Sequence, residues 1–577
     1  METPRSIKEI DLRPIPGKKY WSSEREWREE LIYFLMVDRF HDDRDRRSVG
    51  GVAPARGSGD AARLRRFCGG TLAGITRHID YIQDLGCTAI WLSPIFENDG
   101  APDRASGSYH GYAIRNYLKV DPRFGTKEDL VELVAAAHQR TMRVFLDAVA
   151  NHCGDVWFYP DDQPYFYSDD GRQYEIGGWR HDDYPVPVEL RNPDYFHRRG
   201  QIRDWGWDAQ PETQMGDFFG LKGFNNDDNP AGLALQQIII DVHRYWIREA
   251  DIDGYRMDAV KHMGEMAIAR FCQEVREYAY QLGKRDFFLF GELIAGDDAV
   301  NRYTGPNTAG RLGDRTIYYG LNSVLDFPLY WILPGVIKGY ASPATLTSRY
   351  DALRERALSR GELGRYFVTF LDNHDQVGQH YKRRFGAGAH PKQVVAAVGY
   401  LICALGTPCI YYGTEQGFAG EGTSEEAIRE AMFDLDDTER NLLNKECEIY
   451  REISAIAAVN RSHPALRFGR MYFREVSGDG SGFGMPSGQP CTLAFSRILA
   501  GEEVLVAYNT STDQARSDCV AVDSALHPPG STMAFLYGAV GEAAVQAHPD
   551  QDNATVFVRL QLAPLQFVIL GRLVDAG

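Results

Sequence analysis

Arg256 and Asp258 stand two residues apart at the end of a short run of alternating apolar residues. If this run is a β-strand, both side chains point to the same face, because successive side chains of a strand alternate. An arginine beside an aspartate holds the carboxylate ionised, lowers its pKa and orients it for nucleophilic attack. An isolated pair of this kind is more often a structural ion pair, so its chemistry depends on the residues that accompany it.

Three other apolar segments also end in carboxylate, amide or imidazole side chains. They are residues 144–152, which end in Asn151 and His152, residues 287–293, which contain Glu292, and residues 366–375, which end in Asn373, His374 and Asp375. Such runs are typical of buried parallel strands, and polar groups at their carboxyl ends are typical of a (β/α)8 barrel. Residues 31–37, 88–94, 323–329 and 406–415 supply further strand candidates. The sequence therefore predicts an α/β protein built on a (β/α)8 TIM barrel.

Two parts of the chain depart from the strand and helix alternation. The 68 positions from Trp157 to Phe224 hold 16 aromatic residues among Asp, Gly and Pro, and irregular segments this long are usually functional. We expect most of these rings to form a small core of their own. From residue 470, short alternating runs between Gly, Ser, Asp and Pro indicate an antiparallel β-sandwich.

The predicted organisation has four parts. Residues 1–151 form the first part of the barrel with an N-terminal extension, and residues 152–230 form an inserted loop-rich subdomain after the third strand. Residues 231–469 complete the barrel, with a closing helix over 439–460, and residues 470–577 form the C-terminal sandwich.

Composition excludes several classes of protein. A net charge of −17 disfavours a nucleic-acid or anionic-membrane partner, and a neutral polysaccharide is compatible with it. The nine cysteines are scattered without close pairs, which predicts neither a disulfide framework nor a zinc site. The first residues lack an apolar stretch of signal-peptide length, and residues 31–37 are too short to cross a bilayer. We therefore expect a cytoplasmic protein of undetermined oligomeric state.

The four polar strand ends, taken in order, resemble the four short sequence regions of the α-amylase family of glycoside hydrolases. The resemblance implies that Asp258 is the nucleophile, Glu292 the general acid/base, and Asp375 a third carboxylate that binds sugar hydroxyls. Glu292 suits the acid role, because an apolar strand and negative neighbours raise a carboxyl pKa. Asp147 is expected to pair with Arg256 rather than to touch substrate.

The resemblance also implies the residues that hold the sugar. His152 and His374 donate hydrogen bonds to hydroxyls, Tyr112 stacks on the sugar at the cleavage point, His110 lines the same pocket, and Arg256 completes the set. Lys261 and His262 resemble the pair that binds glucose residues on the leaving-group side in endo-acting α-amylases, and we expect them to line a wet groove. Asn151, Asn225 and the His262 carbonyl match calcium ligands of the family, although residues 221–225 contain no aspartate.

These expectations lead to one function with two alternatives. The first is a retaining glycoside hydrolase that cleaves internal α-1,4-glucosidic bonds of starch, glycogen or maltodextrins through a glycosyl-enzyme intermediate. The second is a 4-α-glucanotransferase or other α-glucan transglycosylase, which would use the same carboxylates. The third is a non-catalytic relative acting as a partner subunit, which predicts loss of the nucleophile or the acid. Both are present.

Overall fold

The computed structural model describes most of the chain. The described residues are 3–44, 47–48, 61–98, 108–162, 164–166, 171–206, 209–304, 309–312, 315–318, 320–357, 363–377, 383–420, 422, 424–437, 440–547 and 555–573.

Eight parallel strands close into a barrel, which confirms the predicted fold class. Each strand pairs with its neighbours in chain order, and the first closes the ring by pairing with both the second and the last; Ile32, for example, lies opposite Ala89 and Cys409. The strands are β1 (Ile32–Leu35), β3 (Ala89–Leu92), β6 (Arg143–Ala148), β11 (Gly254–Met257), β12 (Phe288–Gly291), β15 (Ser323–Leu325), β16 (Phe367–Phe370) and β17 (Thr407–Tyr411).

Aromatic side chains fill the inside of this barrel. Phe34 stacks on Trp91 with ring centroids 3.7 Å apart, and Trp27 stacks on Phe288 at 3.9 Å. Trp27 belongs to η1 (Trp27–Glu29), which precedes the first strand. The interior is therefore a packed core, and polar chemistry is left to the strand ends.

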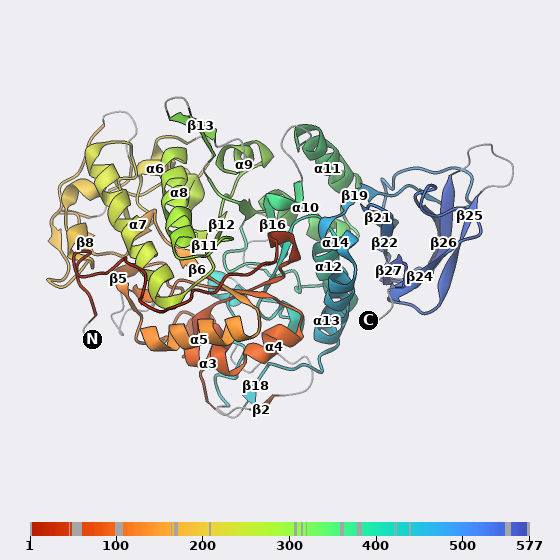
Figure 1. Ribbon diagram of the computed structural model, residues 1–577, viewed down its shortest axis with the longest axis horizontal. Coiled ribbons are helices and arrows are strands. Elements are labelled where there is room, and N and C mark those ends of the chain that lie inside the picture. Colours follow the sequence, from red (N-terminus) through yellow and green to blue (C-terminus); the bar gives the residue numbers. More distant parts are fainter. Residues whose placement is uncertain are drawn as a thin grey trace.

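Helices surround the barrel (Figure 1). They are α3 (Leu72–Arg77), α4 (Ile79–Asp84), α5 (Lys127–Gln139), α7 (Pro230–Ala250), α8 (Glu265–Gln281), α9 (Asp297–Tyr303), α10 (Phe327–Ile337), α11 (Ala344–Ala357), α12 (Pro391–Cys403), α13 (Glu448–Ser462) and α14 (Pro464–Phe468). The start of α7 follows from its sequence, because the Asn229 side chain accepts a hydrogen bond from the Gly232 amide and Pro230 occupies the first turn.

The closing helix begins later than predicted. It starts at Glu448, because Arg440 and Asn441 form strand β18 against β2 (Arg47–Ser48) and the next residues turn. Residue 439, where we expected it to begin, lies outside the described residues.

Smaller elements complete this part of the chain: α1 (Val37–Phe40), α2 (Ala61–Leu64), β4 (Phe96–Asn98), β5 (Ile114–Val120), η4 (Val260–His262), β13 (Ala309–Leu312), β14 (Arg315–Tyr318), η6 (Leu363–Arg365), η8 (Thr414–Gln416) and η9 (Glu425–Ile428).

The segment after β6 is irregular and carries its own aromatic core. Its regular elements are β7 (His152–Cys153), β8 (Trp157–Phe158), β9 (Gly178–Trp179), η2 (Val188–Leu190), η3 (Pro193–Tyr195), α6 (Glu212–Met215) and β10 (Lys222–Gly223). Strand β10 returns to pair with β7, which places Gly223 opposite His152. Trp157, Tyr159, Phe166, Phe196 and Phe224 are buried and only three described rings of the segment are exposed, as expected.

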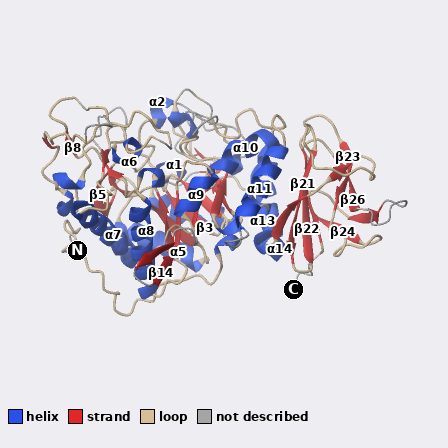
Figure 2. Ribbon diagram, turned by 90° about the horizontal axis from the view of Figure 1, so that it is seen from above, coloured by secondary structure: helices blue, strands red, loops and turns tan. Residues whose placement is uncertain are grey.

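Nine antiparallel strands form the C-terminal unit, which lies at one end of the molecule (Figure 2). They are β19 (Arg470–Phe473), β20 (Val476–Ser477), β21 (Thr492–Leu499), β22 (Glu502–Asn509), β23 (Arg516–Ala521), β24 (Thr532–Tyr537), β25 (Glu542–Ala547), β26 (Val556–Leu562) and β27 (Phe567–Gly571). They enclose a second core that includes Leu505, Val520 and Met533. Arg497 of β21 joins the unit to the barrel by donating to the Cys403 carbonyl at 2.8 Å.

All nine cysteines are free and eight of them are buried. Among the helices in the described ranges, none combines the length and the apolar character needed to cross a membrane.

Candidate active site

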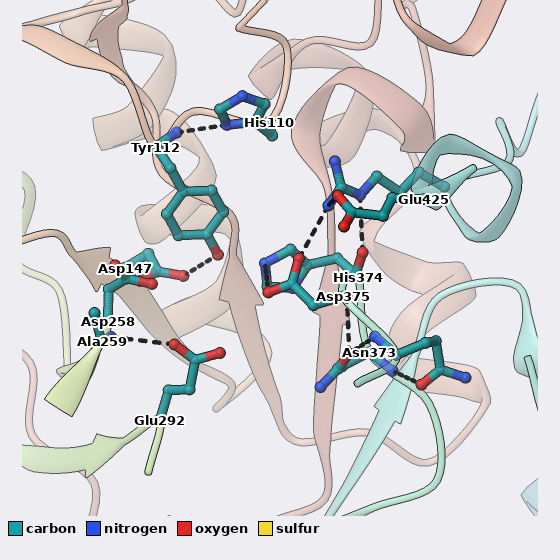
Figure 3. A network of polar contacts seen from close by, with 12 residues as sticks. His110, Tyr112, Asp147, Asp258, Ala259, Glu292, Asn373, His374, Asp375 and Glu425 are labelled. Atoms are coloured by element: carbon teal, nitrogen blue, oxygen red, sulfur yellow. Dashed lines mark hydrogen bonds and ion pairs between the residues drawn. The ribbon is translucent and has the colours of Figure 1, made fainter. Parts of the chain in front are cut away.

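The polar residues singled out by the sequence meet at the carboxyl end of the barrel. Asp258 follows β11, Glu292 follows the adjacent β12, and Asp375 follows β16. Figure 3 shows Asp258, Glu292 and Asp147 facing His374 and Asp375. The closed barrel therefore gathers carboxylates that span more than a hundred residues of the chain, from Asp258 to Asp375.

Arg256 binds three of these carboxylates. Its Nη1 donates to Asp147 Oδ1 at 2.8 Å and to Asp258 Oδ1 at 2.6 Å, and its Nη2 lies 3.1 Å from Glu292 Oε1. The predicted pairings with Asp258 and Asp147 are both present. A backbone bond fixes Glu292 further, because the Ala259 amide donates to its Oε2 at 3.1 Å.

Three carboxylates around one guanidinium leave excess negative charge in a buried place. Burial, the largest effect, raises the pKa of Asp258 to about 7 although Arg256 opposes it. Arg256 therefore lowers this pKa, as predicted, but burial outweighs its effect. Burial and the neighbouring Asp258 and Asp375 charges also raise the pKa of Glu292 to about 7, again against Arg256. The pair keeps a proton near neutral pH, and the shorter bond to Arg256 favours Asp258 as the ionised member.

Asp375, unlike Glu292, is held ionised. Burial acts against its ionisation, but the His374 ring and the Arg429 guanidinium keep its pKa below the usual range. Arg429 Nη2 donates to Asp375 Oδ1 at 2.9 Å, and its Nε donates to the His374 carbonyl at 2.8 Å. Arg429 also reaches the Tyr109 hydroxyl at 3.1 Å. Asp375 is thus an ionised acceptor in a fixed orientation.

The predicted sugar-binding rings lie around the same centre. Tyr112 donates to Asp147 Oδ2 at 2.9 Å, and its ring is parallel to His374 with centroids 5.1 Å apart. The His110 Nδ1 accepts a hydrogen bond from the Tyr112 amide at 3.0 Å. Burial lowers the pKa of His152 to about 4 and those of His110 and His374 to about 3, so the three imidazoles are neutral at pH 7.

Two of these imidazoles have a nitrogen left for substrate. In the part of the chain that the structure describes, Nε2 of His152 and Nδ1 of His374 are buried without a hydrogen-bond partner. His152 Nδ1 lies 3.4 Å from the Asn151 side-chain nitrogen Nδ2, which leaves Nε2 as the donor. His374 Nε2 lies 3.2 Å from Asp375 Oδ2, so its free Nδ1 is an acceptor in that tautomer, where we expected a donor.

Lys261 and His262 are covered by the insertion. Lys261 donates to the Trp205 carbonyl, and His262 Nδ1 bonds the Thr213 carbonyl at 2.6 Å. Only 8% of Lys261 and 7% of His262 is exposed, which is less than expected for side chains in a wet groove, and their contact with sugar on the leaving-group side stays a prediction. Beside them, Trp205 stacks on Phe219 with centroids 5.4 Å apart, and Phe219 is 69% exposed.

Sequence comparison agrees with this geometry. Residues 34–447, more than half of the chain, match the family model described as "Alpha amylase, catalytic domain". The chain belongs to the α-amylase family. The α-amylase of Streptomyces lividans is 32% identical over 536 residues, which cover 82% of this chain and 53% of that protein. The cyclomaltodextrin glucanotransferase of Klebsiella oxytoca is 28% identical over 515 residues, covering 84% and 70%.

Solved structures of the α-amylase family share the fold. The crystal structure of the Geobacillus thermoleovorans α-amylase, complexed with acarbose, has 26% sequence identity and a TM-score of 0.66, and the match covers 96% of this chain and 100% of that one. By contrast, the chain spans about half the length of the Streptomyces α-amylase.

The resemblance to this family implies calcium held by Asn151, Asn225 and the His262 carbonyl. The Asn225 Oδ1 already accepts from the Asp227 amide at 3.2 Å and from Asn229 Nδ2 at 3.3 Å, and its Nδ2 donates to the Asp194 carbonyl. No cluster of three His, Cys, Asp or Glu side chains suited to a metal occurs within the described ranges. The Asn225 side chain is thus engaged within its own loop, and no step below depends on calcium. Binding at Asn151, Asn225 and the His262 carbonyl stays a prediction.

Sequence reasoning missed Arg429. It lies in the charged run from Glu425 to Glu430, which has no strand or motif pattern. Only the closure of the barrel brings this loop, which follows β17, against Asp375.

Proposed function

We propose that the protein is a retaining glycoside hydrolase that cleaves internal α-1,4-glucosidic bonds of starch, glycogen or maltodextrins. The observation that carries the proposal is the binding of Asp258 and Glu292 to one guanidinium group, Arg256. Retaining enzymes keep their two carboxyl groups about 5–5.5 Å apart, whereas inverting enzymes separate them by about 6.5–9.5 Å to admit a water. Two carboxylates that share one guanidinium fit the shorter spacing.

The residues divide the reaction between them. Glu292 gives its proton to the glycosidic oxygen while the Asp258 carboxylate attacks the anomeric carbon, so the C–O bond breaks and a glycosyl ester forms. Glu292, now ionised, then takes a proton from water, which attacks the same carbon and releases Asp258. Asp375 and the free nitrogens of His152 and His374 bind hydroxyls of the same sugar.

A transglycosylase is the second candidate, and one feature favours it. The exposed Phe219 ring stacked on Trp205 offers an apolar platform beside Lys261. By resemblance Lys261 belongs to the leaving-group side, where an acceptor would enter. A sugar bound there would compete with water for the glycosyl-enzyme. Two of the relatives above are an α-amylase and a cyclomaltodextrin glucanotransferase, which is consistent with either outcome.

Incubation with maltoheptaose distinguishes the candidates, with products followed by chromatography over time. Shorter sugars alone would mean hydrolysis, whereas sugars longer than the substrate would mean transfer. An unchanged substrate would refute both. For its location we propose a reducing compartment such as the cytoplasm, which the nine free cysteines support.

A further inference from the structure

The residue that follows Asp375 has an unusual backbone. Gln376 has φ of 46°, in the left-handed region that residues other than glycine seldom adopt. Its side chain is buried, with only 1% of the residue exposed. Such conformations are unfavourable for residues that carry a Cβ, and they persist only where neighbouring contacts enforce them. The contacts of Gln376 should therefore reveal why this conformation is kept.

The Gln376 side chain closes the turn in which it lies. Its Nε2 donates to Asp372 Oδ1 at 2.7 Å and to the Arg383 carbonyl at 2.6 Å, and its Oε1 accepts from the Asn373 amide at 3.2 Å. In return, Asn373 Oδ1 accepts from the amides of Gln376 at 2.7 Å and Asp375 at 2.8 Å. Two side-chain amides thus lock residues 372–376 from both ends.

The base of this turn is also fixed. Asp372 accepts a second bond from the Phe385 amide at 2.7 Å and a third from the Thr414 hydroxyl at 3.2 Å. Gln376 therefore ties the turn to an anchored carboxylate. His374 and Asp375 lie between the two ends, and Figure 3 shows their side chains directed toward Tyr112 and Glu292.

We propose that Gln376 is a positioning residue that holds the 372–376 turn in the conformation that presents Asp375 to the sugar. The inference rests on the proposed function, since it assigns Gln376 a part in the same site. Gln376 itself touches neither Glu292 nor Asp258; it acts through Asp375. Because Asp375 holds the sugar ring rather than the leaving group, losses caused by Gln376 should not depend on the leaving group.

Gln376→Met tests this role, because it keeps the side-chain length and removes all three side-chain bonds. We expect kcat/KM to fall about tenfold to a hundredfold on maltoheptaose and on an activated aryl maltoside alike, which is the range for a misplaced group in a site. Most of the loss should lie in kcat, because the bonds to Asp375 strengthen as the ring flattens. Gln416→Met is the matched control. Gln416 is also buried, at the end of η8 after β17, and donates two side-chain bonds, to the Tyr81 hydroxyl and the Asn444 carbonyl, away from Asp375.

Gln376→Glu keeps the test decisive if the methionine variant does not fold. Its introduced carboxyl faces Asp372, so it can donate there only when protonated. Activity relative to wild type should recover as pH falls from 8 to 5. Because the buried carboxyl also costs stability as pH rises, the variant and the wild type are compared only at pH values where the variant is fully folded. Both variants are assayed well below their Tm, beside wild type and Asp258→Asn.

The outcomes distinguish a failure of the positioning role of Gln376 from a failure of the proposed function. Wild-type kcat in Gln376→Met, an equal loss in Gln416→Met, or no pH-dependent recovery in Gln376→Glu would overturn the positioning role while the enzyme remained active. An inactive wild type would overturn the proposed function and this role with it.

Discussion

Glu292→Gln should stabilise the protein, and the gain should grow with pH. Burial, aided by the Asp258 and Asp375 charges and opposed by Arg256, raises the pKa of Glu292 from 4.5 to about 7. Below pH 4.5 the carboxyl is protonated in the folded and the unfolded chain, so glutamine matches it. From pH 4.5 to 7 the unfolded chain releases this proton and the folded chain keeps it. The wild type therefore loses stability across this window as pH rises, and the variant does not.

The size of the effect follows from the same values. One pKa unit is worth about 1.4 kcal/mol, so the rise from 4.5 to about 7 amounts to about 3 kcal/mol above pH 7. With an unfolding entropy of about 2.1 cal/mol/K per residue, this corresponds to about 2–3 °C in Tm for a chain of 577 residues. Glutamine can keep the bond from the Ala259 amide, so little packing is lost.

Thermal unfolding of both proteins between pH 4.5 and 8.5 measures this gain. The difference in Tm should be near zero at the acid end and reach its full value above pH 7. The exposed Glu446→Gln, far from the carboxylate cluster, is the control and should show no such trend. A constant offset across the range, or a lower Tm for Glu292→Gln at pH 8, would refute the reasoning that the fold holds this carboxyl protonated.

Asp258→Asn should abolish cleavage of a chromogenic maltoside while the protein still unfolds cooperatively; wild-type rates would contradict its role as nucleophile. Glu292→Gln should lose more activity on maltodextrins than on an aryl maltoside whose leaving group departs without protonation, and equal losses would show that Glu292 has another task. Plotted against pH, the wild-type kcat/KM should be bell-shaped with its maximum near pH 7. It should fall on the acid side as Asp258 is protonated and on the alkaline side as Glu292 loses its proton. A profile that is flat from pH 5 to 9 would oppose this assignment. Changing Lys261 and His262 together to Ala should raise KM for long maltodextrins severalfold and shift product lengths, with a small effect on short activated glycosides; complete inactivity on the latter in a folded variant would place the pair in the catalytic centre. Calorimetric titration of chelator-treated protein with Ca²⁺ tests the predicted calcium site, and an absence of heat together with an unchanged Tm would remove it.

The sequence predicted those parts of the site that depend on local periodicity. Alternation along a strand was enough to place Arg256 and Asp258 on one face, and the polar ends of apolar runs located the catalytic end of the barrel. The expected pairing of Asp147 with Arg256 is confirmed by the register of β6 and β11, which sets these two residues opposite each other. These residues were found because their neighbours in the chain determine where they point.

Other properties depend on contacts between distant segments. The pKa of Asp258 rises because neighbouring strands and loops bury it, and no local pattern reports that burial. Lys261 and His262 are covered by a loop some fifty residues earlier in the chain. The left-handed conformation of Gln376 is enforced by an aspartate, an asparagine and a carbonyl, none of which marks the position as special in the sequence.

The bonds from Lys261 and His262 to the Trp205 and Thr213 carbonyls have a consequence for engineering by segment exchange. The insertion and the strand end that bears the nucleophile meet through two side chains on one part and two backbone carbonyls on the other. A chimera that received this insertion from a relative would need carbonyls at the same two places, whatever its side chains. Compatible donors should therefore be selected by backbone path, and the Lys-His pair should be transferred together with the segment that covers it.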